Sequence, residues 1–459
     1  MSKEGNKGLT MAMFETLEVT KEMQNNLEKL GFVKMTEIQA QSLPHTLKGL
    51  DIIAQAKTGS GKTLAFGIPL LEKLDVKKFR PQSLIMCPTR ELADQVANEL
   101  RKIAKFKHNI KILTLCGGSP MRAQIQSLYH GAHVIVGTPG RIQDHIGKNT
   151  LNLNDINTVV LDEADRMLDM GFIDVIEHIL ERVPKKRQTM LFSATFGDDI
   201  KKLSSSIMDN PKMVKVEGAE ENTNIKQLFF LTNKEQKFEA LLTLLRTYKP
   251  ESSIIFCNMK VLVTEVAEGL QDEGFDALDL HGDLDQIDRT ETLLQFANRS
   301  CSILVATDVA ARGLDIDDVD VVINYDLPRD SESFTHRIGR TARAGKSGLA
   351  LSLGTKFELS KFDEKEVKNL NDLDEDPSVT LQASMKTLSL AGGKKSKLRA
   401  GDILGTLCVA IGLTKEEVGK ITINDRHTYV AIKKSAFEKA FKGLQKEKIK
   451  GRNFRVFRV

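Results

Sequence analysis

The octapeptide AKTGSGKT, Ala56 to Thr63, follows a short apolar run and precedes a helical pattern, Leu64 to Leu74. A strand, a glycine-rich turn and a helix in this order predict a P-loop, whose backbone N–H groups surround phosphates. Ala56 takes the first glycine position, Lys62 reaches the β and γ phosphates, and the Thr63 hydroxyl can hold Mg²⁺. A chance glycine-rich turn is the alternative, but the strand and helix stand where a P-loop requires them.

Short apolar runs alternate with helical patterns around this loop, which predicts parallel sheets covered by helices on both faces. The pattern stops at the polar stretch EGAEENTN, residues 217–224, and then resumes, so two similar α/β domains joined by a linker are expected. The predicted strands are Ile52–Ala54, Ser83–Cys87, Val134–Val136, Thr158–Leu161 and Thr189–Phe192, followed by Ile254–Cys257, Ala277–Leu280, Ser302–Ala306 and Val319–Ile323.

The end of the chain has a different pattern. After the acidic stretch NLNDLDEDP, residues 369–377, a βαββαβ-like order predicts a small RRM-like sandwich. From Met385 to Val459 the chain carries 18 Lys and Arg against 6 Asp and Glu, a net charge of +12, and the total of +4 leaves −8 for the rest. This asymmetry is typical of an auxiliary polyanion-binding module, and a merely soluble basic domain is the alternative. The predicted elements are strands Met385–Leu390, Val418–Ile423, Thr428–Ile432 and Phe454–Val459, with helices Gly401–Ile411 and Ser435–Gln445.

The predicted strand Thr158–Leu161 ends in Asp162-Glu163-Ala164-Asp165. Carboxylates at the carboxyl end of a parallel strand face the crevice where such folds bind ligands. Asp162 is therefore placed to hold Mg²⁺ through its hydration shell, and Glu163 to orient and activate the water that attacks a γ phosphate. An acidic helix start favoured by the helix dipole is the alternative, and the P-loop argues against it.

The second α/β domain carries HRIGRTAR, His336 to Arg343. Arg340 and Arg343 stand three residues apart and are predicted to share one helix face. Two arginines from a separate domain can act as arginine fingers, which supply transition-state charge only when the domains close. For an isolated pair, a solvated basic face is the alternative.

Composition argues against several other classes of protein. Hydrophobic residues at 41% and charged residues at 28% are typical of soluble globular chains. No apolar run approaches the ~18 residues of a membrane span, and residues 1–10 lack the apolar core of a signal peptide, so a cytoplasmic protein is expected. The five cysteines form no C-x-x-C pair, and His130 with His133 is interpreted as a solvated surface pair, not a metal site.

Motif by motif, residues from about Phe14 to Ser352 resemble the DEAD-box RNA helicases of superfamily 2. The resemblance implies two tandem RecA-like domains, ATP with Mg²⁺ as cofactors, and RNA as the partner. In chain order the matching motifs are Gly31-Phe32 with Gln39, AKTGSGKT, Pro88-Thr89-Arg90-Glu91-Leu92, Gly117-Gly118, Thr138-Pro139-Gly140-Arg141, Asp162 to Asp165, Ser193-Ala194-Thr195, Ile255-Phe256, His281-Gly282, Gln286 with Arg289, Ala306-Thr307-Asp308, Arg312-Gly313-Leu314-Asp315, and His336 to Arg343.

The resemblance also implies roles for single residues. Gln39 reads the adenine edge, with Phe32 packing on the base and Phe14 supporting it, and Asp315 contacts the ribose or phosphates. Ser193, Thr195 and His336 are implied to link nucleotide state to RNA binding. The implied phosphate-binding residues are Ala56, Lys57, Thr58, Gly59, Ser60, Gly61, Lys62 and Thr63. The implied catalytic residues are Lys62, Asp162, Glu163, Arg340 and Arg343, and Thr63 and Asp162 are the implied metal ligands.

An RNA track is implied as well. Its contacts go to phosphates and 2′-hydroxyls, which position RNA without reading its base sequence. The implied residues are Arg90, Gly118, Thr138, Arg141, Gln286, Arg289 and Thr307. The chain departs from the family pattern at Met35 and Glu37, where prolines are common, at Met259, where threonine is frequent, and at Ala342, which replaces a usual glycine.

The stretch KLRAGDILG, residues 397–405, resembles the C-terminal domain of DbpA-type bacterial helicases, which recognises a hairpin of 23S ribosomal RNA in the peptidyl-transferase region. The first predicted strand lacks an aromatic residue and the third offers only Tyr429, so base stacking on the sheet face is not expected. Binding through a basic edge is predicted instead. Its residues are Lys394, Lys395, Lys397, Arg399, Lys450, Arg452, Arg455 and Arg458, among which Lys397, Arg399, Arg452 and Arg455 are the principal candidates.

The sequence therefore predicts an ATP-dependent RNA helicase that remodels short 23S RNA helices in the pre-50S particle, as a monomer with no predictable protein partner. The rivals are a non-unwinding RNA clamp, against which Glu163, Arg340 and Arg343 argue, and a DNA helicase, which the 2′-hydroxyl contact would distinguish. The expected parts are RecA-like domain 1 (1–216), a linker (217–224), RecA-like domain 2 (225–368), a second linker (369–384) and the RRM-like domain (385–459).

Overall fold

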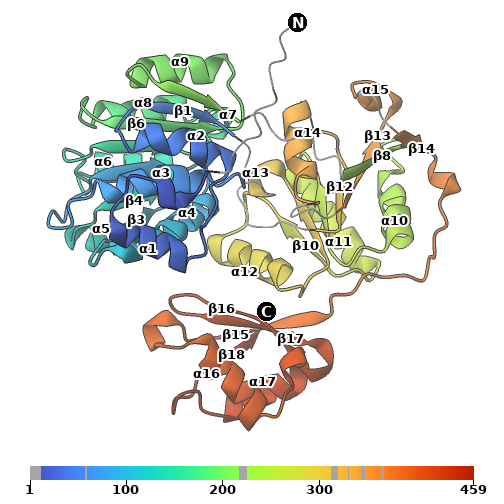
Figure 1. Ribbon diagram of the computed structural model, residues 1–459. Helices are drawn as coiled ribbons and strands as arrows, with labels where there is room; N and C mark the ends of the chain where they lie inside the picture. The colour runs from blue at the N-terminus through green and yellow to red at the C-terminus, as the bar shows by residue number, and fades with distance from the viewer. Residues whose placement is uncertain are drawn as a thin grey trace, which may run out of the picture. The chain divides into compact units, whose positions relative to one another are not determined.

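The computed structural model describes residues 12–56, 59–216, 225–311, 319–328, 330–342, 347–362 and 366–459. The chain divides into two compact units, Met1–Glu221 and Asn222–Val459. Two seven-stranded sheets and one four-stranded sheet are formed by the described residues (Figure 1). The expected α/β class, with two parallel sheets and a small α+β domain, is confirmed.

The first unit is built on one parallel sheet. Its strands are β1 (Ile52–Gln55), β2 (Ser83–Met86), β3 (Ile112–Leu115), β4 (Val134–Gly137), β5 (Thr158–Leu161), β6 (Gln188–Ser193) and β7 (Lys212–Lys215). They lie in the order β3-β4-β2-β5-β6-β1-β7 with every pairing parallel. The five expected strands are confirmed. The two edge strands β3 and β7 were not predicted, because an edge strand is only partly buried and lacks the continuous apolar run of a central one.

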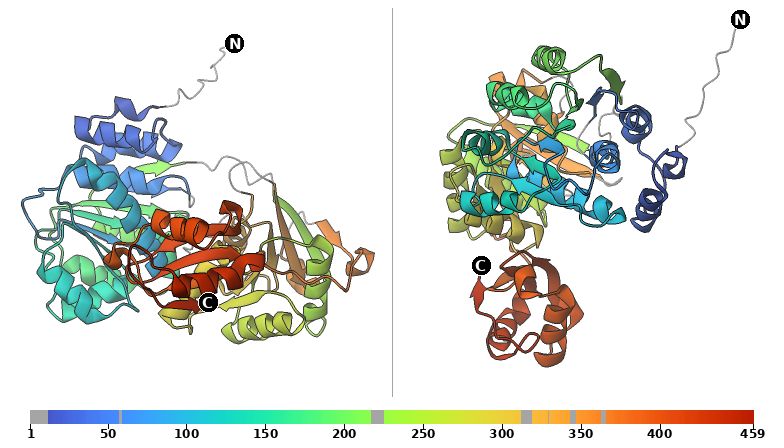
Figure 2. Two further views of the ribbon diagram at one scale, coloured as in Figure 1. Left: turned by 90° about the horizontal axis from the view of Figure 1, so that it is seen from below. Right: turned by 90° about the vertical axis from the view of Figure 1, so that its left-hand side faces the viewer.

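Helices cover both faces of this sheet (Figure 1, Figure 2). They are α1 (Lys21–Lys29), α2 (Glu37–Thr46), α3 (Lys62–Glu72), α4 (Arg90–Ile103), α5 (Met121–Tyr129), α6 (Pro139–Gly147), α7 (Ala164–Asp169), α8 (Ile173–Glu181) and α9 (Asp198–Ile207). Because side chains alternate along a strand, Ile52 and Ala54 of β1 enter one apolar core and Ile53 enters the other. The sheet is thus buried on both sides, and its loops carry the polar chemistry.

The second unit begins with a similar sheet. Its described strands are β8 (Ile225–Leu231), β9 (Ser253–Phe256), β10 (Ala277–Leu280), β11 (Ile303–Ala306), β12 (Val321–Asn324), β13 (Gly348–Gly354) and β14 (Glu366–Lys368). Their order is β10-β11-β9-β12-β13-β8-β14, again with parallel pairings. The predicted strands β9 to β12 are confirmed. The described helices of this sheet are α10 (Lys237–Tyr248), α11 (Lys260–Asp272), α12 (Gln286–Ala297), α13 (Asp308–Ala311), α14 (Ser331–Ile338) and α15 (Lys356–Leu359).

The segment after this sheet, residues 369–384, packs along the second domain. Leu381 is buried in the apolar core beneath α10 and α11. Glu375 accepts hydrogen bonds from the Thr243 hydroxyl at 2.6 Å and from Arg246 Nη1 at 3.3 Å. These contacts tether the stretch that connects the second sheet to the C-terminal domain.

The C-terminal domain has the βαββαβ order that was expected. Its strands are β15 (Met385–Leu390), β16 (Val418–Ile423), β17 (Thr428–Lys433) and β18 (Val456–Arg458), and its helices are α16 (Ala400–Gly405) and α17 (Phe437–Lys446). The antiparallel sheet has the order β16-β17-β15-β18, and both helices lie on one face of it (Figure 1). Alternating residues such as Leu388 and Val430 form the core beneath these helices. A π-helical turn, Thr406–Ala410, extends α16 over most of the predicted helix.

His133 corrects one interpretation, because it is fully buried and not a solvated surface residue. Its Nδ1 accepts the N–H of Lys111 at 3.0 Å, and its Nε2–H donates to the carbonyl of Val76 at 3.2 Å. The ring lies beside Phe79, with 4.8 Å between centroids. These two partners fix the neutral imidazole, and burial lowers the pKa of His133.

This burial predicts a pH-dependent stability of the first domain. A histidine whose folded pKa lies below the unfolded value near 6.5 binds fewer protons in the folded state, so stability falls as pH drops below about 6.5. The loss approaches about 1.4 kcal/mol per pH unit for each such group. Hydrogen exchange of peptides covering residues 107–140 at pH 7.5 and 5.5 measures it. In His133→Asn, which cannot take up that proton, we expect a smaller acid-induced loss of protection, measured relative to the intrinsic exchange rate at each pH. An equal loss of protection in both proteins would contradict the assignment.

Within the described residues, no helix combines the length and apolar character required to span a membrane.

Candidate active site

The glycine-rich loop lies between the carboxyl end of β1 and the start of α3. Gly59 and Gly61 have φ of 81° and 90°, a left-handed conformation that residues with side chains rarely adopt. The buried Lys62 begins α3, and its Nζ donates to the carbonyl of Ala56 at 3.2 Å. The buried hydroxyl of Ser60 has no hydrogen-bond partner within the described ranges. A buried ammonium group and an unsatisfied hydroxyl at a helix N-terminus fit a phosphate ligand. Two predicted contacts, Lys57 and Thr58, lie outside the described residues.

Gln39 connects the start of α2 to the glycine-rich loop. Its Oε1 accepts the N–H of Thr36 at 2.9 Å, and its Nε2 donates to the carbonyl of Gly61 at 2.9 Å. Nearby, the buried ring of Phe14 lies 6.1 Å from the ring of Phe32, measured between centroids. The structure therefore brings the three residues predicted for the adenine pocket to the same end of the first domain as the loop, and Gln39 contacts the loop directly.

The acidic motif follows β5. Asp162 is buried at the end of the strand, and its Oδ1 accepts the N–H of Glu163 at 3.1 Å. Burial raises the pKa of Asp162 to about 6, although the nearby charge of Lys62 opposes the shift. Thr63 at the start of α3 and Asp162 both offer oxygen ligands. Mg²⁺ prefers oxygen ligands, and it usually takes only one or two from the protein while keeping several bound waters. A buried carboxylate with a raised pKa is a site that a cation stabilises, so the residues present fit Mg²⁺.

Glu163 has a left-handed backbone with φ of 52° and precedes α7. Its Oε2 accepts a charge-assisted hydrogen bond from Arg166 Nη1 at 2.7 Å, and both side chains are about 10% exposed. The cost of an unusual backbone conformation, about 1–3 kcal/mol, persists only where the surroundings impose it. The turn and the ion pair together hold the carboxylate of Glu163 in one position beside Asp162.

Asp165, which was not among the predicted site residues, connects the acidic motif to Ser193-Ala194-Thr195 at the end of β6. Its Oδ2 accepts the N–H groups of Ala194 and Thr195, each at 2.9 Å. The Ser193 hydroxyl accepts the N–H of Asp165 at 3.3 Å, and the Ser193 carbonyl accepts the N–H of Ala56 at 2.9 Å. Ser193 and Thr195 are thus hydrogen-bonded to the motif predicted to hold the metal. The signal in the sequence was a second aspartate three residues after Asp162.

The RNA-track candidates of the first domain follow three neighbouring strands, β3, β4 and β2. Gly118 follows β3 with φ of 73°, Thr138 precedes α6, and Arg90 begins α4 after β2. Arg141 in the first turn of α6 donates from Nη1 to the carbonyl of Ser119 at 3.0 Å. Because parallel strands end at one edge of a sheet, the four candidates lie on the same edge as the acidic motif.

The candidates of the second domain also gather at one place. Gln286 and Arg289 lie in the first turn of α12, whose N-cap is Asp285. Arg289 Nη2 donates to the carbonyl of Ala310 at 2.8 Å, and the Thr307 hydroxyl accepts the N–H of Ala310 at 3.4 Å. Helix α12 and helix α13, which follows β11, are therefore joined at the carboxyl edge of the second sheet.

The arginine-finger segment differs from its prediction. Helix α14 ends at Ile338, so Arg340 lies in the following turn and not on a helix face. Gly339 caps the helix, and Ala342 has φ of 59°, where glycine avoids the strain that a side chain brings. Because α14 has already ended, the helical spacing assumed for the arginine pair does not hold at Arg340. Arg340 is buried and lines a small pocket with His336. Arg343 and Asp315 lie outside the described residues.

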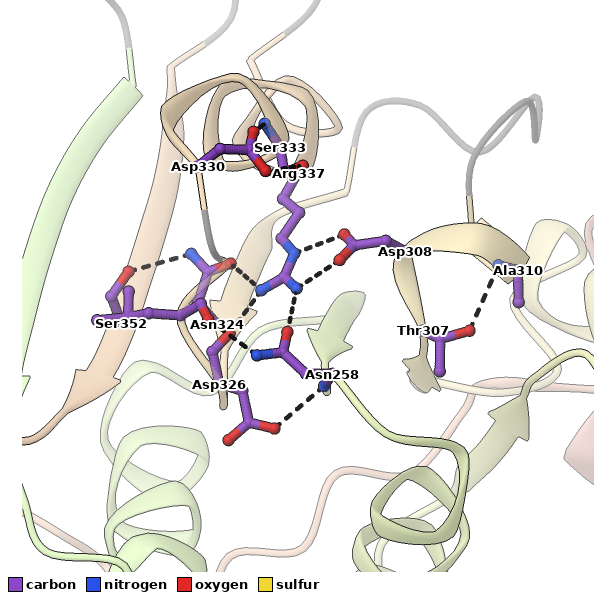
Figure 3. A network of polar contacts seen from close by, with 11 residues as sticks. Asn258, Thr307, Asp308, Ala310, Asn324, Asp326, Asp330, Ser333, Arg337 and Ser352 are labelled. Carbon is purple, nitrogen blue, oxygen red and sulfur yellow. Dashed lines mark hydrogen bonds and ion pairs between the residues drawn. The ribbon is translucent and has the colours of Figure 1, made fainter. Parts of the chain in front are cut away.

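Arg337 forms a buried network that sequence reasoning missed (Figure 3). Its side chain is 1% exposed, and its Nε and Nη2 each donate to the carboxylate of Asp308 at 2.6 Å. Nη2 also donates to Asn258 Oδ1 at 2.7 Å, and Nη1 donates to Asn324 Oδ1 at 3.2 Å. The guanidinium lies over Phe256, with 5.1 Å from Cζ to the ring centroid. One side chain thus joins the ends of β9, β11 and β12 to α14, the helix that precedes Arg340.

The basic residues predicted in the C-terminal domain are exposed, and two segments of them are neighbours. Lys450 Nζ donates to the carbonyl of Lys397 at 3.1 Å, and the N–H of Ala391 donates to the carbonyl of Arg455 at 2.9 Å. Residues 394–399 and 450–455 therefore form one surface, which we call the basic edge. Arg458 is engaged elsewhere, since it forms an ion pair with Glu438 at 2.8 Å.

Tyr429 lies on the sheet face of this domain and is buried. Its hydroxyl donates to Glu291 Oε1 at 3.2 Å, and burial together with this carboxylate raises the pKa of Tyr429 to about 12. On the same face, the Thr387 hydroxyl donates to the Ser300 hydroxyl at 2.8 Å. A tyrosine held in this way is not available to stack on a base.

Comparison with known proteins agrees with this geometry. The DEAD/DEAH box helicase family matches residues 36–203, the helicase conserved C-terminal domain matches residues 236–345, and the DbpA RNA binding domain matches residues 387–458. The chain is 48% identical over 453 residues to the ATP-dependent RNA helicase DbpA of Escherichia coli (strain K12), covering 97% of this chain and 99% of that protein. It is 39% identical over 475 aligned residues to the ATP-dependent RNA helicase DbpA of Bacillus subtilis (strain 168), covering 97% and 99%.

Two solved structures share the fold of most of the chain. S. cerevisiae Dbp5 bound to RNA and ADP BeF3 superposes with a TM-score of 0.70 and 32% identity, covering 78% of this chain and 96% of that one. Mss116p bound to ssRNA and AMP-PNP gives a TM-score of 0.70 at 29% identity, covering 80% and 81%. With its glycine-rich loop, its acidic motif and its basic C-terminal domain in the expected places, the chain belongs to the DEAD-box family of ATP-dependent RNA helicases.

Proposed function

We propose that this helicase acts on short helices of 23S ribosomal RNA during assembly of the large ribosomal subunit, directed there by its C-terminal domain. The observation that carries the proposal is the basic edge, whose lysines and arginines are exposed on a domain with a net charge of +12. Such a surface neutralises RNA phosphates, whereas Tyr429 on the sheet face of this domain is buried and not accessible to RNA bases. The match to the DbpA RNA binding domain supports the choice of RNA.

In the proposed chemistry, Lys62 and Mg²⁺ held by Thr63 and Asp162 neutralise the phosphates, and Glu163 orients the attacking water. Arg340 and Arg343 supply positive charge from the second domain. Gln39 with Phe32 holds the adenine, and Ser193 and Thr195 transmit nucleotide state to the RNA track. We also propose that the protein acts as a monomer, since one chain contains both the P-loop and the arginine segment.

Steady-state ATP hydrolysis tests the targeting. The full chain and a chain ending at Ser384 are each given a 23S peptidyl-transferase hairpin or an unrelated RNA of equal length. Truncation at Ser384 keeps Leu381, which is buried in the core of the second domain. We expect the full chain to reach half-maximal stimulation at a lower concentration of the ribosomal hairpin than of the unrelated RNA. The truncated chain should require equal concentrations of the two RNAs. Equal responses of both chains to both RNAs would leave a general helicase and contradict the ribosomal assignment.

The basic edge makes a separate prediction. Charge reversal at Lys397, Arg399 and Arg452 should weaken hairpin binding by more than about tenfold and flatten its salt dependence, because each lost phosphate contact lowers the slope of log K against log salt by about 0.7 to 0.9. Fluorescence anisotropy between 50 and 200 mM KCl measures both effects. The matched control reverses three exposed lysines on α17, which are Lys439, Lys442 and Lys446. Equal losses in both variants would mean that net charge alone directs binding.

A further inference from the structure

A buried hydrogen-bond centre lies beneath the RNA track of the first domain. It consists of Gln124 on α5, which is 6% exposed, and His145 on α6, which is fully buried. Neither residue belongs to the motifs that carry the nucleotide chemistry. Gln124 contacts both Arg141 and the residue before the Gly117-Gly118 loop, and His145 contacts Gln124 from the helix that carries Arg141.

The partners of Gln124 determine how its amide is oriented. Its Nε2 donates to the carbonyl of Cys116 at 2.8 Å, and only the NH₂ end of an amide can do so. Its Oε1 therefore faces the two donors on α6, Arg141 Nη1 at 3.3 Å and His145 Nε2 at 2.9 Å.

The same logic assigns the proton of His145. Because Oε1 of Gln124 is an acceptor, Nε2 of His145 carries hydrogen, and Nδ1 lies 2.8 Å from the Thr150 hydroxyl. Burial lowers the pKa of His145, and the neighbouring charge of Arg141 acts in the same direction. Both ring nitrogens of His145 and both ends of the Gln124 amide thus have a polar partner.

These contacts attach the Gly117-Gly118 loop at both of its ends. Cys116, immediately before the loop, is held by Gln124, and Ser119, immediately after it, accepts from Arg141 Nη1 at 3.0 Å. The side chain of Arg141 is 14% exposed, so its guanidinium is held by the protein while part of it faces solvent. Helix α5, the loop and helix α6 consequently share one polar junction.

We infer that Gln124, oriented by His145, is a positioning residue for RNA binding, which sets the guanidinium of Arg141 and the Gly117-Gly118 loop in one arrangement before RNA arrives. This inference rests on the proposed RNA contacts of Gly118 and Arg141. A long arginine loses rotamer freedom when it binds RNA, and a residue that restricts it beforehand reduces that loss. Gln124 has no contact with the P-loop or the acidic motif among the hydrogen bonds of the described residues, so its effect is confined to RNA.

The test compares Gln124→Met with the wild-type full chain in RNA-stimulated ATP hydrolysis. We expect the RNA concentration for half-maximal stimulation to rise about tenfold, with kcat at saturating RNA and affinity for a fluorescent ATP analogue within twofold of wild type. A loss of general stability would not produce this split. Gln126→Met, an exposed position on the same helix, is the matched control and should behave as wild type.

Gln124→Glu provides a second variant in case Gln124→Met does not fold. Glutamate keeps an acceptor for Arg141 and His145 but loses the donor to Cys116, so the half-maximal RNA concentration should fall between those of wild type and Gln124→Met. In addition, Arg141→Ala combined with either variant should add little, because the proposed effect acts through Arg141.

The outcomes are distinguishable. If RNA stimulates the wild type and the folded Gln124 variants have the same half-maximal RNA concentration, the inference alone is overturned. It is also overturned if the effects of the Gln124 variants and of Arg141→Ala on that concentration are fully additive. A wild-type chain without RNA stimulation would contradict the proposed function and this inference together.

Discussion

Replacing Glu163 with glutamine is expected to reduce ATP turnover by about 10²–10⁴-fold, the usual contribution of a positioned general base, while ATP still binds. Glutamine has the same shape and keeps an oxygen for Arg166, but it cannot take a proton from the attacking water. The left-handed turn at residue 163 and the ion pair at 2.7 Å hold this side chain in place, so the loss belongs to the chemical step.

Single-turnover hydrolysis and binding of a fluorescent ATP analogue separate the two effects. Glu177→Gln is the matched control, since Glu177 is exposed on α8 of the same domain and should leave turnover unchanged. Thermal unfolding of each variant shows whether the buried Arg166, left beside a neutral partner, destabilises the domain. Turnover of Glu163→Gln within tenfold of wild type, with normal folding, would remove Glu163 from its proposed role.

Replacing Arg337 with methionine is expected to destabilise the second domain by about 3–5 kcal/mol, the range found when one partner of a buried ion pair is removed. Methionine fills part of the volume, but Asp308 loses both of its 2.6 Å hydrogen bonds, and Asn258 and Asn324 lose a donor. RNA-stimulated turnover should fall as well, because the same side chain anchors the helix before Arg340.

Urea denaturation gives the change in stability, and hydrogen exchange of peptides from residues 253–342 locates it. Arg299→Met is the matched control, because its ion pair with Glu251 at 3.2 Å is exposed, with 71% and 81% of the two side chains accessible. Exposed pairs contribute about 0–1 kcal/mol. If the two substitutions had equal effects, the buried network would have no special role in holding the site together.

The sequence predicted the interior of the fold better than its margins. Central strands such as β5 and β9 are continuous apolar runs, because helices cover both of their faces. Edge strands such as β7 bury one residue in four and resemble loops in sequence. The segment 369–384 was expected to be a linker on account of its acidic composition, yet a few apolar residues such as Leu381 are enough to attach it to the second domain.

For the site, motifs predicted residue types more reliably than contacts. Gly61, Lys62 and Asp162 lie together because their order along parallel strands determines which edge they occupy. The hydrogen-bond partners of Asp165, Gln124 and Arg337 lie on other elements of the fold, which spacing along the chain does not reveal. The helix face predicted for Arg340 was wrong because α14 ends at Ile338, with Gly339 as its cap, so Arg340 lies in the turn that follows.

The two hydrogen bonds of Gln39 have a consequence for the design of inhibitors. Since its amide already has a donor at Thr36 and an acceptor at Gly61, a compound that displaces these partners gains only the difference between new and old hydrogen bonds. A heterocycle that offers just one matching group would bind more weakly than its contact area suggests. Compounds that leave Gln39 where it is and extend instead along the half-buried ring of Phe32 avoid this exchange, and their selectivity among related helicases would depend on shape.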